Sequence, residues 1–233
     1  MVAIFVIATI ITCVGIEIAL DRIARRKHAT VPARAVPATA DRFLIPRGYF
    51  LSRGHSWVEL LVNGNARVGL DDFVQKLVGT VDTILAPPMN AEVKKGEKLF
   101  TIRQGARTLT FQSPLSGRIV EVNSSLSLEP GVLKHDPYVS GWVAVIEPTN
   151  LAQELKPLAV AEDALQWLRE EIRRFRNFVK EQVSLPAPGA FAPASVTLLD
   201  GGMPLAGVLQ QTDGKTWQAF EKEFLAANGI STN

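Results

Sequence analysis

The pattern that most restricts the fold of this chain lies between Phe100 and Gly117, where apolar and polar residues alternate around a short polar tip. Alternation with a period of two, interrupted by a glycine, predicts a β-hairpin, here with its tip at residues 103–107. The second run ends at residues 113–117 (SPLSG), where the proline fixes φ and the glycine permits a positive φ. A further alternating run at residues 118–123 predicts the next strand of the same domain.

Similar patterns extend this β-rich domain over residues 52–158. Residues 58–62 and 66–70 flank an Asn-Gly turn, which favours a second hairpin. Asp71 precedes an expected short helix at 72–77 and is placed to cap it. The other expected elements are strands at 81–85 and 142–146 and turns at 86–90 and 94–97.

A long amphipathic helix is predicted in residues 159–184, about 161–182. Leu165, Leu168, Ile172, Phe175 and Val179 recur there at intervals of three and four, which makes one apolar stripe. Two interpretations of this stripe stay open. It packs on the β domain of its own chain, or it contacts a partner subunit, in which case Phe175 is a contact residue.

The last part of the chain is expected to form a small hairpin and a helix. Residues 185–194 are rich in proline and predict a linker. Within residues 195–233, strands are expected at 196–199 and 205–209, followed by a helix capped by Asp213. A unit this small needs a surface to pack on, in its own chain or in a partner, and Trp217 is therefore a second candidate partner contact.

The N-terminal residues predict a membrane anchor. Residues 2–20 are nearly all apolar, with Glu17 as their only charged residue, and as a helix they reach about 28 Å, close to the thickness of a bilayer core. The basic residues follow this run, which predicts an uncleaved single span over residues 1–20 with the bulk of the chain on the cytoplasmic side. Glu17 either reaches the membrane interface or contacts a partner helix within the membrane.

Residues 21–51 predict a basic, proline-containing linker. Residues 21–53 contain eight Arg or Lys against two Asp, which favours contact with anionic lipid headgroups. We therefore expect the bilayer to be one partner of this chain.

Several motifs occur together in an order that resembles the glycine cleavage H-protein family, a relative of lipoyl domains. The resemblance implies a mainly β, α+β fold of the barrel-sandwich hybrid type, with two small sheets and helices at their edges. It also implies a hairpin tip that presents a lipoylated lysine. The motifs are His55–Val58, 68–75, 93–97, 113–117, 121–123, 136–138 and Gly141–Trp142.

The resemblance fails at the position of the modified lysine, which corresponds to Ala106. No lysine occurs between Lys98 and Lys134, and lipoylation requires a lysine amine, so no cofactor is expected. The family has an acidic residue three positions before its lysine, whereas this chain has Arg103. Arg103 and Arg107 form either a solvated basic tip or a contact for a phosphate or an acidic partner.

The composition excludes several other functions. A net charge of +2 does not indicate a nucleic-acid-binding protein, and a single cysteine excludes an intramolecular disulfide framework. The three histidines, His28, His55 and His135, do not have a metal-ligand spacing, and there is no glycine-rich phosphate loop. We therefore expect neither a metal site nor an enzyme.

The leading hypothesis is a non-catalytic accessory subunit of a larger complex, anchored to the cytoplasmic face of a bacterial inner membrane. An electron-transfer complex is one plausible host. The alternatives are a membrane-bound carrier modified at another lysine, or a regulator that binds the partner enzymes of H-proteins.

Overall fold

The computed structural model describes residues 36–38, 43–183 and 206–226. The predicted anchor at residues 1–20, with Glu17, and the linker at 185–194 lie outside the described residues. Within the described ranges, no helix is long and apolar enough to cross a membrane.

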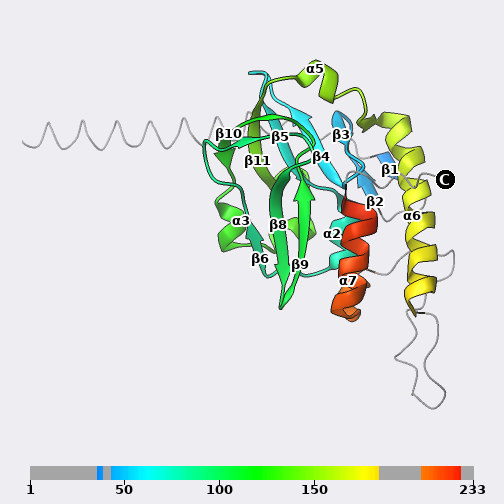
Figure 1. Cartoon of the computed structure of the whole chain (residues 1–233). Helices are drawn as coiled ribbons and strands as arrows, with labels where there is room; N and C mark the ends of the chain where they lie inside the picture. Colours follow the sequence, from blue (N-terminus) through cyan, green and yellow to red (C-terminus); the bar gives the residue numbers. More distant parts are fainter. Residues whose placement is uncertain (1–35, 39–42, 184–205, 227–233) are drawn as a thin grey trace, which may run out of the picture. The chain divides into compact units, whose positions relative to one another are not determined.

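Antiparallel strands form the centre of the fold (Figure 1). Among the described residues, the largest sheet has the strand order β12-β3-β4-β5-β11-β10-β7, a smaller sheet has the order β6-β8-β9, and β1 pairs with β2. The strands are β1 Val36–Ala38, β2 Phe43–Ile45, β3 Tyr49–Leu51, β4 Ser56–Leu60, β5 Ala66–Leu70, β6 Thr83–Leu85, β7 Glu92–Val93, β8 Lys98–Gln104, β9 Arg107–Gln112, β10 Gly117–Val122, β11 Trp142–Pro148 and β12 Ala159–Val160.

Helices lie at the edges of these sheets (Figure 1). Asp71 caps α2 by accepting a hydrogen bond from the backbone N–H of Val74, as the sequence predicts. The helices are α2 Asp72–Val78, α3 Ser125–Leu128, α4 Val132–His135, α5 Leu151–Glu154, α6 Ala161–Val183 and α7 Gly214–Phe220, with a 3₁₀ turn η1 at Leu209–Gln211 and a π turn η2 at Glu221–Leu225.

The predicted hairpins are present because alternate side chains enter one core. In the β8–β9 hairpin, Phe100 and Phe111 stack with their ring centroids 4.7 Å apart and are fully buried. In the larger sheet, Trp57 packs over Gly69, where any added side chain would meet the indole ring. Trp57 also donates a hydrogen bond from Nε1 to the carbonyl of Pro137, 3.1 Å away, which fixes the loop before β11.

Two predictions for the ends of the domain are wrong. The linker expected at 21–51 includes β2 and β3, because Phe43, Ile45, Tyr49 and Leu51 are apolar side chains that the core buries. In place of the strand expected at 205–209, residues 206–208 form a turn leading into η1, since Gly207 has a left-handed φ of +73°. Its expected partner strand at 196–199 lies outside the described residues.

The long helix α6 packs on its own chain. It contacts β1, β2, β3 and β12, and Phe175 lies 6.0 Å from the ring of Phe73 on α2. On its other side, Phe175 and Phe178 join Phe220 and Phe224 in a cluster of four buried rings. The apolar stripe of α6 is therefore filled by the β domain and by α7, which lies beside α6 in Figure 1.

Candidate functional site: the hairpin tip

The β8–β9 hairpin ends in a two-residue tip. Arg103 pairs with Thr108 and Gln104 with Arg107, which leaves Gly105 and Ala106 as the connection. Gly105 adopts a φ of +57°, a left-handed conformation that glycine tolerates well. Ala106 is exposed, so the side chain that the tip presents to solvent is a methyl group.

Hydrogen bonds hold one side of the tip to the loop before β6. The backbone N–H of Gly105 donates to Asp82 Oδ2 at 2.6 Å, and the N–H of Asp82 donates to the carbonyl of Arg103 at 2.9 Å. Gln104 is buried and donates from Nε2 to the carbonyls of Val78 and Thr80. Although its tip contains a glycine, this turn is tied to neighbouring backbone at several points.

Arg107 holds the other side of the tip to the C-terminal segment, residues 206–226. Its Nη1 donates to the carbonyl of Thr212 at 2.7 Å and to that of Gln210 at 3.2 Å. Its Nη2 donates to Gln104 Oε1 at 2.7 Å, and its guanidinium carbon lies 4.7 Å from the ring centroid of Trp217. Arg107 is therefore a structural residue. The sequence had suggested either a solvated cation or a contact for a partner, and the structure shows neither.

The other predicted contact residues differ in their exposure: Phe175 and Trp217 are buried, whereas Arg103 is exposed. Phe175 and Trp217 are 0% and 1% exposed, so of the two interpretations left open for them, packing within the chain is the one that the structure shows. Trp217 donates from Nε1 to the carbonyl of Leu209 at 2.7 Å, which explains why its polar atom can be buried. Arg103 is exposed and donates to Thr83 Oγ1 at 3.2 Å, which is compatible with a solvated cation.

The C-terminal segment also covers the outer edge of the hairpin. Strand β9 is the last strand of its sheet, and an unpaired edge leaves backbone donors without partners. Glu221 supplies the partner for one of these donors, since its Oε1 accepts a hydrogen bond from the N–H of Thr110 at 2.7 Å. The sequence did not indicate this contact, because it joins positions far apart in the chain.

The segment approaches the end of α2 closely enough to require glycine at position 79. The N–H of Gly207 donates to the carbonyl of Lys76 at 2.7 Å. Gly79 has a φ of +78°, and a Cβ there would lie 3.0 Å from the Cα of Gly207 and 2.8 Å from Gln210 Oε1. The two backbones therefore meet in a fit that a side chain would disturb.

A buried network of charged side chains connects α6 to the N-terminal end of α2. His55 is fully buried, its Nδ1 lies 2.7 Å from Asp71 Oδ2, and its Nε2 lies 3.4 Å from Glu171 Oε1. Burial opposes a charge on the imidazole, but the carboxylates of Asp71 and Glu171 outweigh it and raise the pKa of His55 to about 9. Because it is inaccessible, this imidazolium connects α2 to α6 rather than serving as a catalytic base.

The same network continues to the C-terminal segment. Glu171 accepts hydrogen bonds from Arg174 Nη1 at 2.8 and 2.9 Å. Arg174 in turn donates from Nη2 to the carbonyl of Glu223 at 2.5 Å, and its guanidinium lies over the ring of Phe224. The hairpin tip and the α6 network thus hold opposite sides of the same segment.

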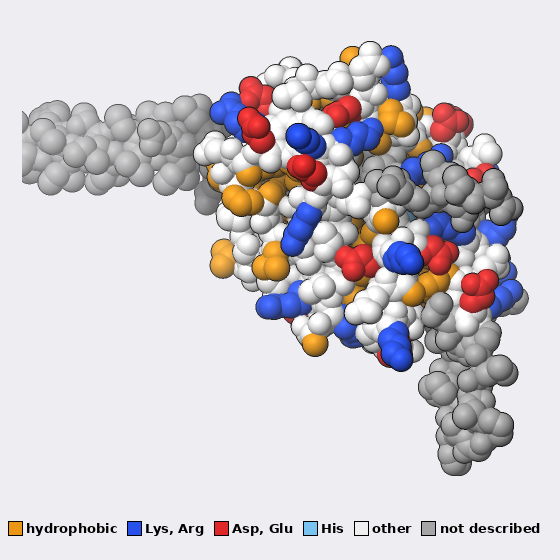
Figure 2. Space-filling model, in the orientation of Figure 1, with side chains coloured by type: hydrophobic (Ala, Val, Ile, Leu, Met, Phe, Trp, Pro, Cys, Tyr) orange, Lys and Arg blue, Asp and Glu red, His pale blue; other side chains and the backbone are white. Residues whose placement is uncertain are grey.

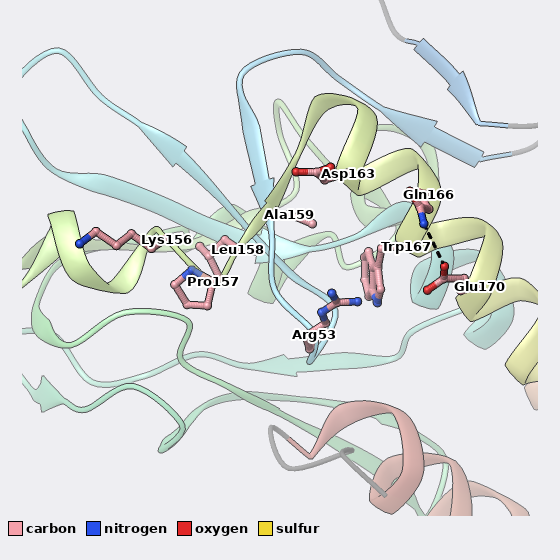
Figure 3. A pocket seen from close by; sticks show the side chains of 9 residues that line it. All are labelled: Arg53, Lys156, Pro157, Leu158, Ala159, Asp163, Gln166, Trp167 and Glu170. Carbon is pink, nitrogen blue, oxygen red and sulfur yellow. Dashed lines mark hydrogen bonds between the residues drawn. The ribbon is translucent and has the colours of Figure 1, made fainter.

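A surface hollow of about 310 Å³ lies between α6 and the chain before it (Figure 3). Its charged lining residues have both signs, and Arg53 lies over the ring of Trp167, its guanidinium carbon 5.6 Å from the ring centroid. It contains no histidine, cysteine, serine or threonine. Within the part of the chain that the structure describes, no group of three or more His, Cys, Asp or Glu is placed to hold a metal ion. The residues lining the hollow are Arg53, Lys156, Pro157, Leu158, Ala159, Asp163, Gln166, Trp167 and Glu170.

Comparisons with known proteins concern the β domain and the first part of α6, up to residue 171. The family model for the glycine cleavage H-protein matches residues 49–171. A probable glycine cleavage system H protein of Pyrococcus abyssi is 35% identical over 127 residues, which are 54% of this chain and 94% of that protein. Glycine cleavage system H protein 4 of Aquifex aeolicus is 34% identical over 130 residues, 56% of this chain and 75% of that protein.

One solved structure is similar over the same proportion of the chain. It is a glycine cleavage system H protein from Mycobacterium marinum, with a TM-score of 0.48 and 23% identity, covering 54% of this chain and 99% of that one. The matched family range ends at residue 171, so Trp217 and the other contacts of the C-terminal segment lie beyond it.

Proposed function

The chain belongs to the glycine cleavage H-protein family, and on that premise we propose that it is a non-catalytic accessory subunit that has no lipoyl group. Its sheet-rich domain has the lipoyl-domain-like fold of that family. The observation that carries the proposal is Ala106, an exposed alanine at the two-residue tip of the β8–β9 hairpin. A carrier of this type needs a tip lysine, and a methyl group offers no nitrogen for an amide bond.

The contacts around the tip favour a scaffold over a carrier. A carrier hairpin has to present its group to successive enzymes. Here Asp82 holds one side of the tip, and Arg107 ties the other side to residues 210 and 212. A hairpin fixed in this way is suited to a constant position within an assembly.

The N-terminal sequence supports a position at a membrane. The apolar run at residues 2–20 is long enough to span a bilayer core, and the basic residues after it favour a cytoplasmic location for the folded domain. We therefore place the domain, in this proposal, at the cytoplasmic face of a bacterial inner membrane, where other subunits of a membrane complex are its partners.

Co-purification from native membranes tests this role. The full chain, tagged at its C-terminus and extracted in a mild detergent, is expected to elute with a constant set of other subunits. Elution as a single monomer, with no partner at comparable amounts, would count against an accessory subunit. If the chain is absent from the membrane fraction before detergent is added, the anchor is contradicted but the accessory role is not.

The two other hypotheses make different predictions for the same preparation. A carrier modified elsewhere would have a covalent group on another lysine, such as Lys98 or Lys134, which peptide mapping detects. A regulator would bind the partner enzymes of H-proteins, and direct binding assays with those enzymes measure this. No contact in the described structure favours either hypothesis over the accessory subunit.

A further inference from the structure

Helix α6 has a stripe of basic side chains along its outer side. The basic stripe consists of Arg169, Arg173, Arg176 and Lys180, which follow one another at intervals of four, three and four. In a helix of 3.6 residues per turn these positions fall within an arc of about 60° and extend over about 16 Å. Arg169, Arg173 and Lys180 are exposed and Arg176 is half-buried. Figure 2 shows Lys and Arg side chains along the edge of the molecule where Figure 1 places α6.

The arginines of the stripe have no polar partner within the described part of the chain. Among the described residues, Arg169, Arg173 and Arg176 make no ion pair and no hydrogen bond, and the buried Nε of Arg176 has no partner. Arg174, which points to a different side of α6, shows the contrast, since it pairs with Glu171 and contacts Glu223. These three arginines therefore keep their capacity to bind anions.

The acidic residues of α6 lie mostly away from the stripe. Asp163, Glu170 and Glu181 are displaced from it by roughly 100° around the helix axis. Glu162 alone shares the direction of the stripe, about two turns before Arg169. One side of α6 can thus meet a negatively charged surface while its main acidic groups stay further from that surface.

The stripe lacks the apolar groups that a protein interface needs. The centre of a protein–protein interface is depleted in charged residues and enriched in aromatic side chains. Among the side chains that the structure describes, none of the large exposed hydrophobic residues is on α6; they are Leu44, Leu60, Val62, Leu85, Met89, Leu128 and Val139. Adsorption to lipid headgroups, in contrast, requires only positive charge close to an anionic surface.

We propose that the basic stripe of α6 contacts anionic phospholipid headgroups and orients the folded domain on the bilayer. This inference rests on the membrane anchor in the proposed function and adds which face of the domain meets the lipid. Each basic side chain at an anionic leaflet is expected to raise the ratio of docked to undocked domain about fivefold. The contact weakens in high salt, because exposed charges are screened over about 8 Å at physiological ionic strength.

Fluorescence quenching on the full chain in lipid nanodiscs tests the orientation. Because the chain has one cysteine, Cys13→Ser provides a background for single labels. The reporter is Asn177→Cys, an exposed position beside the stripe that leaves all four cations in place. The reference label is Leu128→Cys on α3, which is 89% exposed and lies on the opposite side of the domain in Figure 1. A spin label on the lipid headgroups quenches a fluorophore that is close to the membrane.

We expect the label at position 177 to be quenched in discs containing anionic lipid, and the label at 128 to be little affected. Replacing the anionic lipid by phosphatidylcholine, or adding high salt, should remove the quenching. Arg169→Gln with Arg173→Gln should lower the docked-to-undocked ratio about twenty-fivefold. Lys215→Gln with Lys222→Gln, which removes two exposed cations of the C-terminal segment, is the matched control and should change it little.

The outcomes separate this inference from the proposed function. Incorporation of the chain into discs with no quenching at position 177 overturns the docking and leaves the anchor standing. Equal quenching in zwitterionic and anionic discs, or no effect of the arginine variants, also overturns it. A chain that does not enter the discs contradicts the anchor and, with it, this orientation.

Discussion

The guanidinium of Arg107 lies 4.7 Å from the ring centroid of Trp217 and donates a hydrogen bond to the carbonyl of Thr212 at 2.7 Å. This contact joins the position after the hairpin tip to a segment that lies beyond the family match. It makes the C-terminal segment part of the hairpin surface, so residues at the tip determine how firmly that segment is held.

Replacing Arg107 should loosen the C-terminal segment. Arg107→Ala removes charge-assisted hydrogen bonds to the carbonyls of residues 210 and 212, which are left without that donor, and the expected cost is about 2 kcal/mol. Hydrogen exchange should rise in residues 206–226 more than in β4 and β5. Arg103→Ala, at the exposed arginine of the same tip, is the control and should cost less than about 0.5 kcal/mol. Equal exchange in both variants would contradict the role assigned to Arg107.

Gly79 should resist substitution because of its neighbours as well as its backbone. Gly79→Ala places a methyl group 3.0 Å from the Cα of Gly207, so we expect a loss of about 2–3 kcal/mol in the free energy of unfolding. Gly64→Ala is the matched control, since Gly64 has a φ of +86° but open space around it. Its loss should be limited to about 1 kcal/mol from the left-handed backbone. Urea unfolding of the two variants measures the difference, and similar losses would show that the close approach to Gly207 has no energetic weight.

Stability should fall as the pH rises through the pKa of His55. The folded-state pKa is raised to about 9, above the ordinary value of 6.5, so the stabilisation is fully present below pH 6.5 and is lost as the pH passes 9. The difference corresponds to roughly 3 kcal/mol. Urea unfolding as a function of pH measures it.

His55→Gln is the control for this pH dependence. Glutamine cannot carry the charge, so the variant should be less stable at neutral pH and should lack the decline between pH 6.5 and 9 that the native chain shows. A native chain whose stability stays constant over this interval would contradict a charged His55 in the Asp71–Glu171 network.

Much of the β domain could be predicted from local patterns. Alternation indicated the β4–β5 and β8–β9 hairpins, and Asp71 and Asp213 cap α2 and α7 as expected. The apolar stripe also gave α6 nearly its full length. These features depend on residues that are close together in the sequence, so local patterns are enough to predict them.

The failed predictions concern contacts between distant segments. Strands β2 and β3 are short and lie among prolines and arginines, so composition suggested a linker although the core buries their apolar residues. Arg107, Phe175 and Trp217 looked available for partners because nothing local shows that residues 206–226 return to the hairpin. Ala106 was placed correctly at the tip, since that depends only on hairpin register.

The intact mass of the full chain, isolated from its native membranes, tests the central claim most directly. We predict the mass of the polypeptide without a lipoyl group, because the tip residue Ala106 has no amine. Peptide mapping of the same sample should return residues 98–112 unmodified. A mass increase equal to one lipoyl group, on any residue of the native chain, would contradict the account.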